Sequence, residues 1–314
     1  MSDQDIASSE AFEEDVADDA SSSTRGNWAG SDVTPDEIEW LQRTFRIPEG
    51  VECRIPGNEI EPDPREGEYV VFTSHFERGF GLPISDFLKQ FMEHYHLQPH
   101  HLPANAMVLL SSAVTLSEGF LGLLPTIEFW AKYHTFRTQV KPDPNSNGDK
   151  EMVQCGAAAL SPRRFSILPR VKGSDSVKMW QRSFFYVKNS TPTDKIRLPE
   201  YAPGVPSNRS NWKYTPDEDV LELKLIHSQI VELKDKGLTS DDILRCFISR
   251  RISPLQLRTH KICYTSGRLD PNRTSVHILD KYEIYKRVKA IAATKMVDSH
   301  WRWGLKPHTR LKPP

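Results

Sequence analysis

The feature that most constrains the fold is a long stretch without charged side chains in the middle of the chain. Between Leu97 and Ser117 there is no Asp, Glu, Lys or Arg. From Ala104 to Phe120, nonpolar residues recur at helical spacing and also cover the other sides, as in a helix that its neighbours bury. Prolines, histidines and serines in and before this run argue against a membrane span. The sequence therefore predicts a buried core helix over 104–120.

Further helices are predicted before and after this core helix. Phe87, Phe91 and Tyr95 share one face of a helix that precedes it, and a helix that follows it carries Trp130. Nearer the amino end, Thr34 is followed by Pro and, three residues on, by Glu, which is the pattern of a capping box. A short amphipathic helix is expected to begin there.

The second half of the predicted compact region changes to a strand pattern. After a polar loop at 141–150, short strands are predicted at 152–160, 165–171 and 178–187, and together they would form a small antiparallel sheet. The segment 190–214 contains four prolines and is predicted to be a linker or an extended wrap.

The last third of the chain returns to helical spacing. Thr215 is predicted to cap a long helix that ends at Gly237, and Thr239 is predicted to cap the next helix. A further helix with basic sides is predicted over 284–291. The whole sequence thus predicts an α+β protein that is predominantly helical: a helical core, a small antiparallel sheet and a carboxyl-terminal helical region.

Charge is distributed unevenly along the chain. Residues 1–68 contain 19 acidic and 5 basic residues, whereas the formal net charge of the whole chain is only -1. The rest of the chain must therefore be basic, which fits either a body that meets polyanions or an ordinary basic surface behind an acidic leader. Residues 1–32 are predicted to be disordered, because they contain too few nonpolar residues to form a core.

The expected compartment is intracellular, in the nucleus or the cytoplasm. The four cysteines are far apart in the sequence, which is typical of isolated thiols in a reducing environment. The amino end is acidic and lacks the basic and nonpolar pattern of a signal peptide, so secretion is not expected. No membrane association is predicted.

Several known signatures of catalysis and metal binding are missing from the sequence. There is no Asp-Thr-Gly or Asp-Ser-Gly of an aspartic protease, no Tyr-x-Asp-Asp of a reverse transcriptase and no paired cysteines of a zinc knuckle. Four histidines between His94 and His101 suggest a metal site, but no nearby cysteine completes it. We expect these imidazoles to contact backbone groups instead. No catalytic residue, metal ligand or cofactor is predicted.

Nucleic-acid binding is suggested by basic residues that alternate with aromatic ones between Ser161 and Asn189. A basic sheet with aromatic rings can stack on bases and contact phosphates, but the same spacing fits a strand whose aromatic face lies in the core. A second basic region covers 245–314. The candidate residues for RNA or DNA are Arg163, Arg164, Arg170, Lys172, Lys178, Trp180, Arg182, Arg250, Arg251, Lys286, Arg287 and Lys289.

Several sequence blocks, taken together, resemble a known family. They are FERGFGLPISDFL (76–88), LQPHHLPANA (97–106), VTLSEGFLG (114–122), SVKMWQRSFFYVKN (176–189), RRISPLQLRTHKICYTSGRLDPNRTS (250–275) and EIYKRVKAI (283–291). In this order they are similar to the gypsy-type transposon domain proteins of plants, over roughly 34–291. The resemblance implies an origin in a long-terminal-repeat element and supplies no catalytic residues.

With this resemblance, the predicted domain organisation is complete. The predicted units are an acidic leader (1–32), the gypsy-type transposon domain (33–189), a Pro-rich linker (190–214), a helical region (215–297) and a basic tail (298–314). The leading functional expectation is a non-enzymatic structural or interaction protein that self-associates, in a role like that of a gag product. The alternatives are a nucleic-acid-binding module using 161–189 and 245–314, and a metal-dependent nuclease or strand-transfer enzyme.

Overall fold

The computed structural model places the core of the chain in detail. It describes residues 28–43, 47–121, 123–142, 152–163, 166–168, 178–206, 210–217, 220–240 and 243. The predictions for the leader up to residue 27, for the loop at 143–150 and for everything after residue 243 fall outside this part of the chain.

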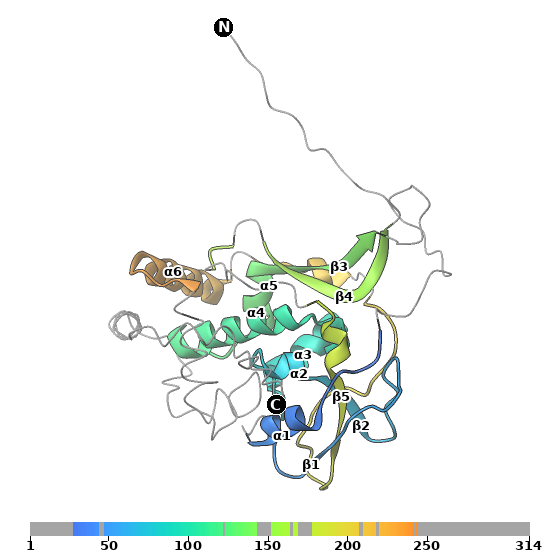
Figure 1. Cartoon of the computed structure of the whole chain (residues 1–314). Helices are drawn as coiled ribbons and strands as arrows, with labels where there is room; N and C mark the ends of the chain where they lie inside the picture. Colours follow the sequence, from blue (N-terminus) through green and yellow to red (C-terminus); the bar gives the residue numbers. More distant parts are fainter. Residues whose placement is uncertain are drawn as a thin grey trace, which may run out of the picture.

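The fold is mixed α/β, so the prediction of a predominantly helical protein is wrong. About 41% of the described residues are helical and about 17% lie in strands. The strands form two small antiparallel sheets, one of three strands and one of two. The core helix lies between these two sheets (Figure 1). No strand was predicted at 51–54, where Pro, Gly and Glu are frequent, or at 134–142, which directly follows a helix.

The buried core helix is confirmed. Helix α4 (Ala104–Thr115) has ten buried residues among its twelve, and it continues as one turn of π-helix over Leu116–Leu121. The predicted helix before it is α3 (Asp86–Tyr95), which follows the single turn α2 (Thr73–Phe76). The predicted helix after it is α5 (Ile127–Tyr133).

The three-stranded sheet brings together segments that are far apart in the sequence. Its order is β1 (Val51–Arg54), β5 (Phe184–Asn189) and β2 (Glu68–Phe72), and both pairings are antiparallel. The central strand β5 begins with four consecutive buried residues. The prediction that 178–187 joins 152–160 in one sheet is therefore wrong, and Trp180–Ser183 forms a short 3-10 helix instead.

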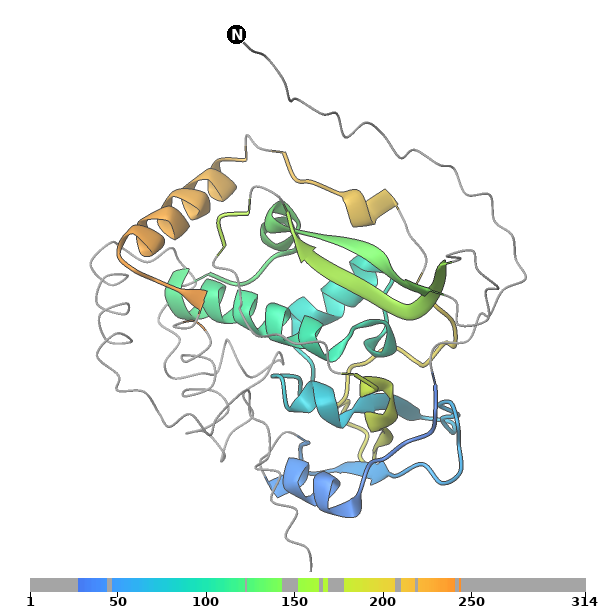
Figure 2. The ribbon, with the colours of Figure 1, turned by 45° about the horizontal axis from the view of Figure 1, so that its top comes forward.

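The second sheet is a long hairpin above α4 (Figure 2). Strand β3 (His134–Pro142) starts immediately after α5 and pairs with β4 (Met152–Pro162). The predicted strand at 152–160 is thus confirmed, but its partner comes before the loop and not after it. Of the strand predicted at 165–171, residues 166–168 are described and are not in a strand.

Segments on either side of these elements complete the main core. Helix α1 (Pro35–Arg43) begins as predicted: the Thr34 backbone N–H donates to the Glu37 carboxylate at 2.9 Å. The segment after β5 packs back onto the helices. Within it, the Trp212 indole Nε1 donates to the backbone oxygen of Tyr95 at 2.9 Å, so this extended segment contributes directly to the core.

Helix α6 (Leu221–Asp235) has the predicted buried face but not the predicted start. The buried residues are Leu223, Ile226, Ile230 and Leu233. The helix begins at Leu221 and not directly after Thr215, whose hydroxyl donates to the Lys213 backbone oxygen instead. At the other end Gly237 adopts a positive φ of 93°, as predicted for the residue that ends the helix. Among the helices of the described residues, none is long and nonpolar enough to cross a bilayer.

Candidate functional site

Four of the twelve residues proposed for nucleic-acid binding belong to the described part of the chain. These are Arg163, Lys178, Trp180 and Arg182. The other eight lie outside the described residues: Arg164, Arg170, Lys172, Arg250, Arg251, Lys286, Arg287 and Lys289. The structure does not bring the four together as one basic surface, because their side chains have different environments.

Two of the four stabilise the fold through their guanidinium groups. Arg163 donates from Nε to the Ala131 backbone oxygen at 2.7 Å and from a terminal nitrogen to the Tyr214 backbone oxygen at 2.6 Å. Arg182 forms an ion pair with Asp32 at 2.6 Å. Arg163 joins the end of β4 to α5 and to the segment after β5, and Arg182 joins the 3-10 helix before β5 to the segment before α1. Both arginines therefore have structural partners.

The aromatic side chain Trp180 faces the interior. It is buried and stacks on the His75 ring, with a centroid separation of 5.2 Å and an interplanar angle of 24°. Phe184 and Tyr186 on the next strand are also buried. In this structure the aromatic residues of the segment therefore form core, and Lys178 is the exposed member of the described four.

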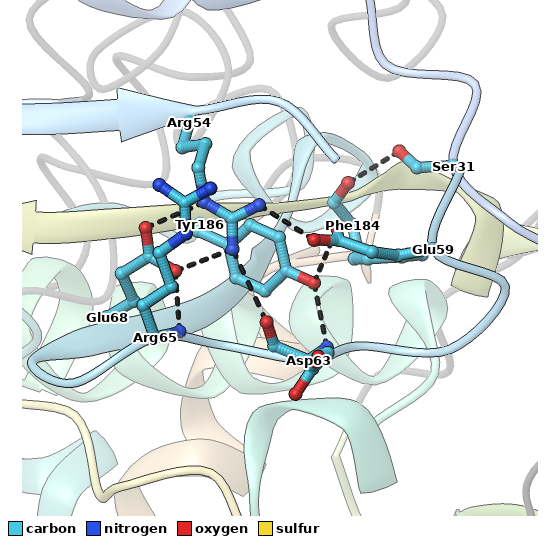
Figure 3. A network of polar contacts seen from close by, with 8 residues as sticks. All are labelled: Ser31, Arg54, Glu59, Asp63, Arg65, Glu68, Phe184 and Tyr186. Carbon is cyan, nitrogen blue, oxygen red and sulfur yellow. Dashed lines mark hydrogen bonds and ion pairs between the residues drawn. The ribbon is translucent and has the colours of Figure 1, made fainter. Parts of the chain in front are cut away.

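The densest polar network lies on the three-stranded sheet (Figure 3). Arg54 donates two hydrogen bonds to Glu68, at 2.7 and 2.6 Å, and a third to Glu59 at 2.8 Å. Its guanidinium carbon lies 3.8 Å from the centre of the Tyr186 ring, and the Tyr186 hydroxyl donates to Glu59 and accepts from the Asp63 backbone N–H. The hydrogen bonds from Arg54 lower the pKa of Glu68. Each charge has a fixed partner, so the network stabilises β1 and β2 around β5.

Several histidines are buried as neutral rings. The His75 Nε2–H donates to the Leu102 backbone oxygen at 2.8 Å, and burial lowers the pKa of His75 to about 3. His101 accepts from the Gln98 backbone N–H, and its burial lowers the pKa to about 4. Of the four histidines between His94 and His101, His101 makes the expected contact with a backbone group. Across the described residues, His, Cys, Asp and Glu do not gather in groups of three or more that could hold a metal.

A groove of about 470 Å³ lies between the hairpin and the first turns of α4, and sequence analysis did not predict it. Its walls include the exposed residues Arg137 and Gln139 on β3, the half-buried Asn105 on α4, and Trp180. None of the described residues that line it is acidic. No strand was predicted at 134–140, although the alternation of Phe136 with polar neighbours could have indicated one.

A second unpredicted feature is an exposed nonpolar patch where α6 begins. It comprises Leu124 (47% exposed), Val220 (42%), Leu221 (70%) and Leu225 (47%). Leu124 and Val220 line the same small cavity, of about 130 Å³, and Leu221 and Leu225 are one helical turn apart. We call these four residues the α6 patch. Contiguous exposed nonpolar surface is a feature that proteins use for contact with other surfaces when it is large enough.

Comparisons with known proteins identify part of the chain. Residues 70–138 match the model of the family described as "Putative gypsy type transposon", a narrower range than the resemblance over 34–291. Comparisons with the curated proteins and with the solved structures found no match. The matched range runs from β2 through the core helices into β3, and it supplies one wall of the groove. Residues 70–138, about a fifth of the chain, are therefore similar to the gypsy-type transposon domain family.

Proposed function

We propose that this chain is an element-derived, non-enzymatic interaction protein that self-associates, in a role comparable to that of a gag product. The observation that carries the proposal is the α6 patch. The opposite face of α6 already buries four large nonpolar residues against the core. Leu221 and Leu225 are therefore not needed to attach the helix, and their exposure costs free energy that a partner surface would recover.

A second copy of the chain is the partner that the patch fits best. In a two-fold symmetric contact the same patch serves both copies. Leu221 would then face the partner's Leu225, because the two leucines are one turn apart on one helix. With only four nonpolar residues on each side, the interface is small, and small interfaces are weak or transient. Association is expected only at high protein concentration.

The test measures mass in solution by sedimentation over a wide range of protein concentrations. The wild-type chain is expected to shift towards a dimer or larger species as concentration rises, and the double variant Leu221→Ser, Leu225→Ser should shift much less. A matched control is Ile60→Ser, because Ile60 is 68% exposed but lies in the connection between β1 and β2. A wild-type chain that stays monomeric throughout would contradict the proposal.

The groove supports a second candidate function, binding of RNA or DNA. Arg137 is exposed and forms no ion pair with another described residue, and Lys178 is exposed two residues before the groove residue Trp180. Phosphate contacts by such residues would make affinity fall steeply with salt. Substituting Arg163 is a poor test, because its loss removes two structural hydrogen bonds.

The test is retention on single-stranded RNA and DNA over a salt gradient. The double variant Arg137→Ala, Lys178→Ala should weaken retention. The slope of the logarithm of the binding constant against the logarithm of the salt concentration should become less steep by roughly 0.7 for each phosphate that is no longer neutralised. Arg43→Ala with Lys89→Ala removes the same charge from two surface helices and serves as the control. Equal effects of both pairs would remove the groove from consideration. Strand cleavage that depends on Mg²⁺ in the same samples would contradict a non-enzymatic role.

A further inference from the structure

The described chain begins at a residue that is fixed to the body of the protein. The Trp28 ring lies 5.8 Å from the Phe184 ring and 6.1 Å from the His100 ring, measured between centroids. Three residues later, the Ser31 hydroxyl donates to the Phe184 backbone oxygen at 2.6 Å. These contacts set the place where the preceding residues leave the folded domain.

That place is close to the groove beneath the hairpin. Trp28 also stacks on Phe72, and Phe72 in turn lies 4.9 Å from Trp180, which lines the groove. Trp28 packs on the same nonpolar cluster as Ala104 and Ala157, from α4 and β4. Residues 1–27 are therefore attached to the described chain at Trp28, which is linked to the groove residue Trp180 through a single intervening ring, Phe72.

Charge and length both suit this segment to the groove. The 27 residues before Trp28 contain eight acidic residues and one basic residue. The groove is lined by Arg137, Asn105 and Gln139, and no carboxylate occurs among the lining residues that the structure describes. A chain of this length can extend about 90 Å, so its carboxylates can reach the groove. Because the two are covalently joined, the local concentration is in the millimolar range, where even a weak contact is populated.

We propose that the acidic segment 1–27 occupies the groove beneath the β3–β4 hairpin, with its carboxylates paired with Arg137. The segment then acts as a built-in competitor that covers this basic surface until a stronger polyanion displaces it. The inference does not depend on self-association, because the α6 patch is formed by other residues and is tested by other variants.

The experiment compares the full chain with a full chain in which the acidic residues before Trp28 are changed to the matching amides. The substitutions are Asp3→Asn, Asp5→Asn, Glu10→Gln, Glu13→Gln, Glu14→Gln, Asp15→Asn, Asp18→Asn and Asp19→Asn. The measurement is the rate at which phenylglyoxal modifies each arginine, followed by mass spectrometry of peptides. At low salt, Arg137 should react several-fold faster in the amide variant. In about 1 M salt, where screening acts over roughly 3 Å, the two chains should react alike.

Arg43 is the internal control. It is exposed on α1 and paired with Glu39, so its modification rate should be the same in both chains. An equal rise at Arg43 and Arg137 would show a general charge effect and would overturn the proposal. An unchanged rate at Arg137 would also overturn it. Equal midpoints of the two chains in urea unfolding would show that the amide substitutions leave the fold intact.

Discussion

Lowering the pH from 7 to 5 should remove about 2 kcal/mol of folding free energy through His75 alone. This imidazole is fully buried and is the central ring of an aromatic group with Phe72 and Trp180. Its Nε2–H donates to the Leu102 backbone oxygen, and its Nδ1 has no hydrogen-bond partner within the described structure. Protonation would place a charge and an unpaired N–H in the core.

The sign and size of the effect follow from the pKa. Burial, the largest cause, lowers the pKa of His75 from the ordinary 6.5 to about 3. The folded state therefore favours the neutral ring, so its stability is intact above pH 6.5 and falls as the pH drops towards 3. In the unfolded chain His75 has the ordinary pKa of 6.5. A pH of 5 lies about one and a half units below this value, so the unfolded chain binds the proton and the folded chain does not. With about 1.36 kcal/mol per unit, the loss is about 2 kcal/mol.

The assay is urea unfolding, monitored by circular dichroism, of the wild type and of His75→Phe at pH 7 and pH 5. Phenylalanine retains a ring but cannot donate to the Leu102 oxygen, so at pH 7 the variant should be less stable by roughly 1–3 kcal/mol. At pH 5 the difference should shrink by about 2 kcal/mol, because only the wild type has the titrating group. All other histidines are common to both proteins. A stability difference that is the same at both pH values would refute the reasoning.

Three further changes test the fold by urea unfolding or thermal melting. Arg54→Ala leaves the carboxylate of Glu68 buried without its two hydrogen bonds and should lower the free energy of unfolding by about 3 kcal/mol; a loss below 1 kcal/mol would show that the network is not structural. Trp212→Phe removes the buried hydrogen bond to the Tyr95 oxygen and should cost about 1–2 kcal/mol, whereas an unchanged midpoint would contradict that role. Gly237→Ala should lower the free energy of unfolding by about 1 kcal/mol, because the φ of 93° is unfavourable for alanine. The added Cβ would meet no atom within 4 Å, so no clash contributes. An unchanged free energy of unfolding would argue against this helix end.

The helices were predictable because their signals are local. The face formed by Phe87, Phe91 and Tyr95 is visible in ten consecutive residues, and all three are buried in α3. The capping pattern at Thr34 likewise needs only four residues. The same pattern at Thr215 failed, because the residues between it and Leu221 do not continue as a helix. A cap pattern identifies a possible start, and packing of the following residues decides whether it is used.

The sheet could not be predicted from the sequence because its pairings are not local. Four consecutive nonpolar residues at the start of β5 indicate a strand buried on both faces, but they carry no information about its neighbours. The partner of Lys188 on β2 is Glu68, 120 positions earlier. Proximity in sequence favoured 152–160 as the partner, and the core around β5 overrode that preference.

The candidate site was missed for a related reason. The groove lies between α4 and the β3–β4 hairpin, and no strand was predicted where β3 lies. For the segment around Trp180, the sequence left two readings open, a base-stacking surface and a core face. In the structure Trp180 is buried and its ring stacks on His75, as the core reading requires.

The range 70–138 that identifies the family is not a physical unit by itself. It begins inside β2, whose partner is β5, and ends inside β3, whose partner is β4. Its central core also contains Leu41 from α1 and Trp212 from the segment after β5. Without β4 and β5, the edges of β2 and β3 would be exposed. Without Trp212, the Tyr95 backbone oxygen would lose the hydrogen bond that it accepts from the indole. Whatever activity this domain has must therefore be assayed in a chain that includes the surrounding strands and the extended segment after them.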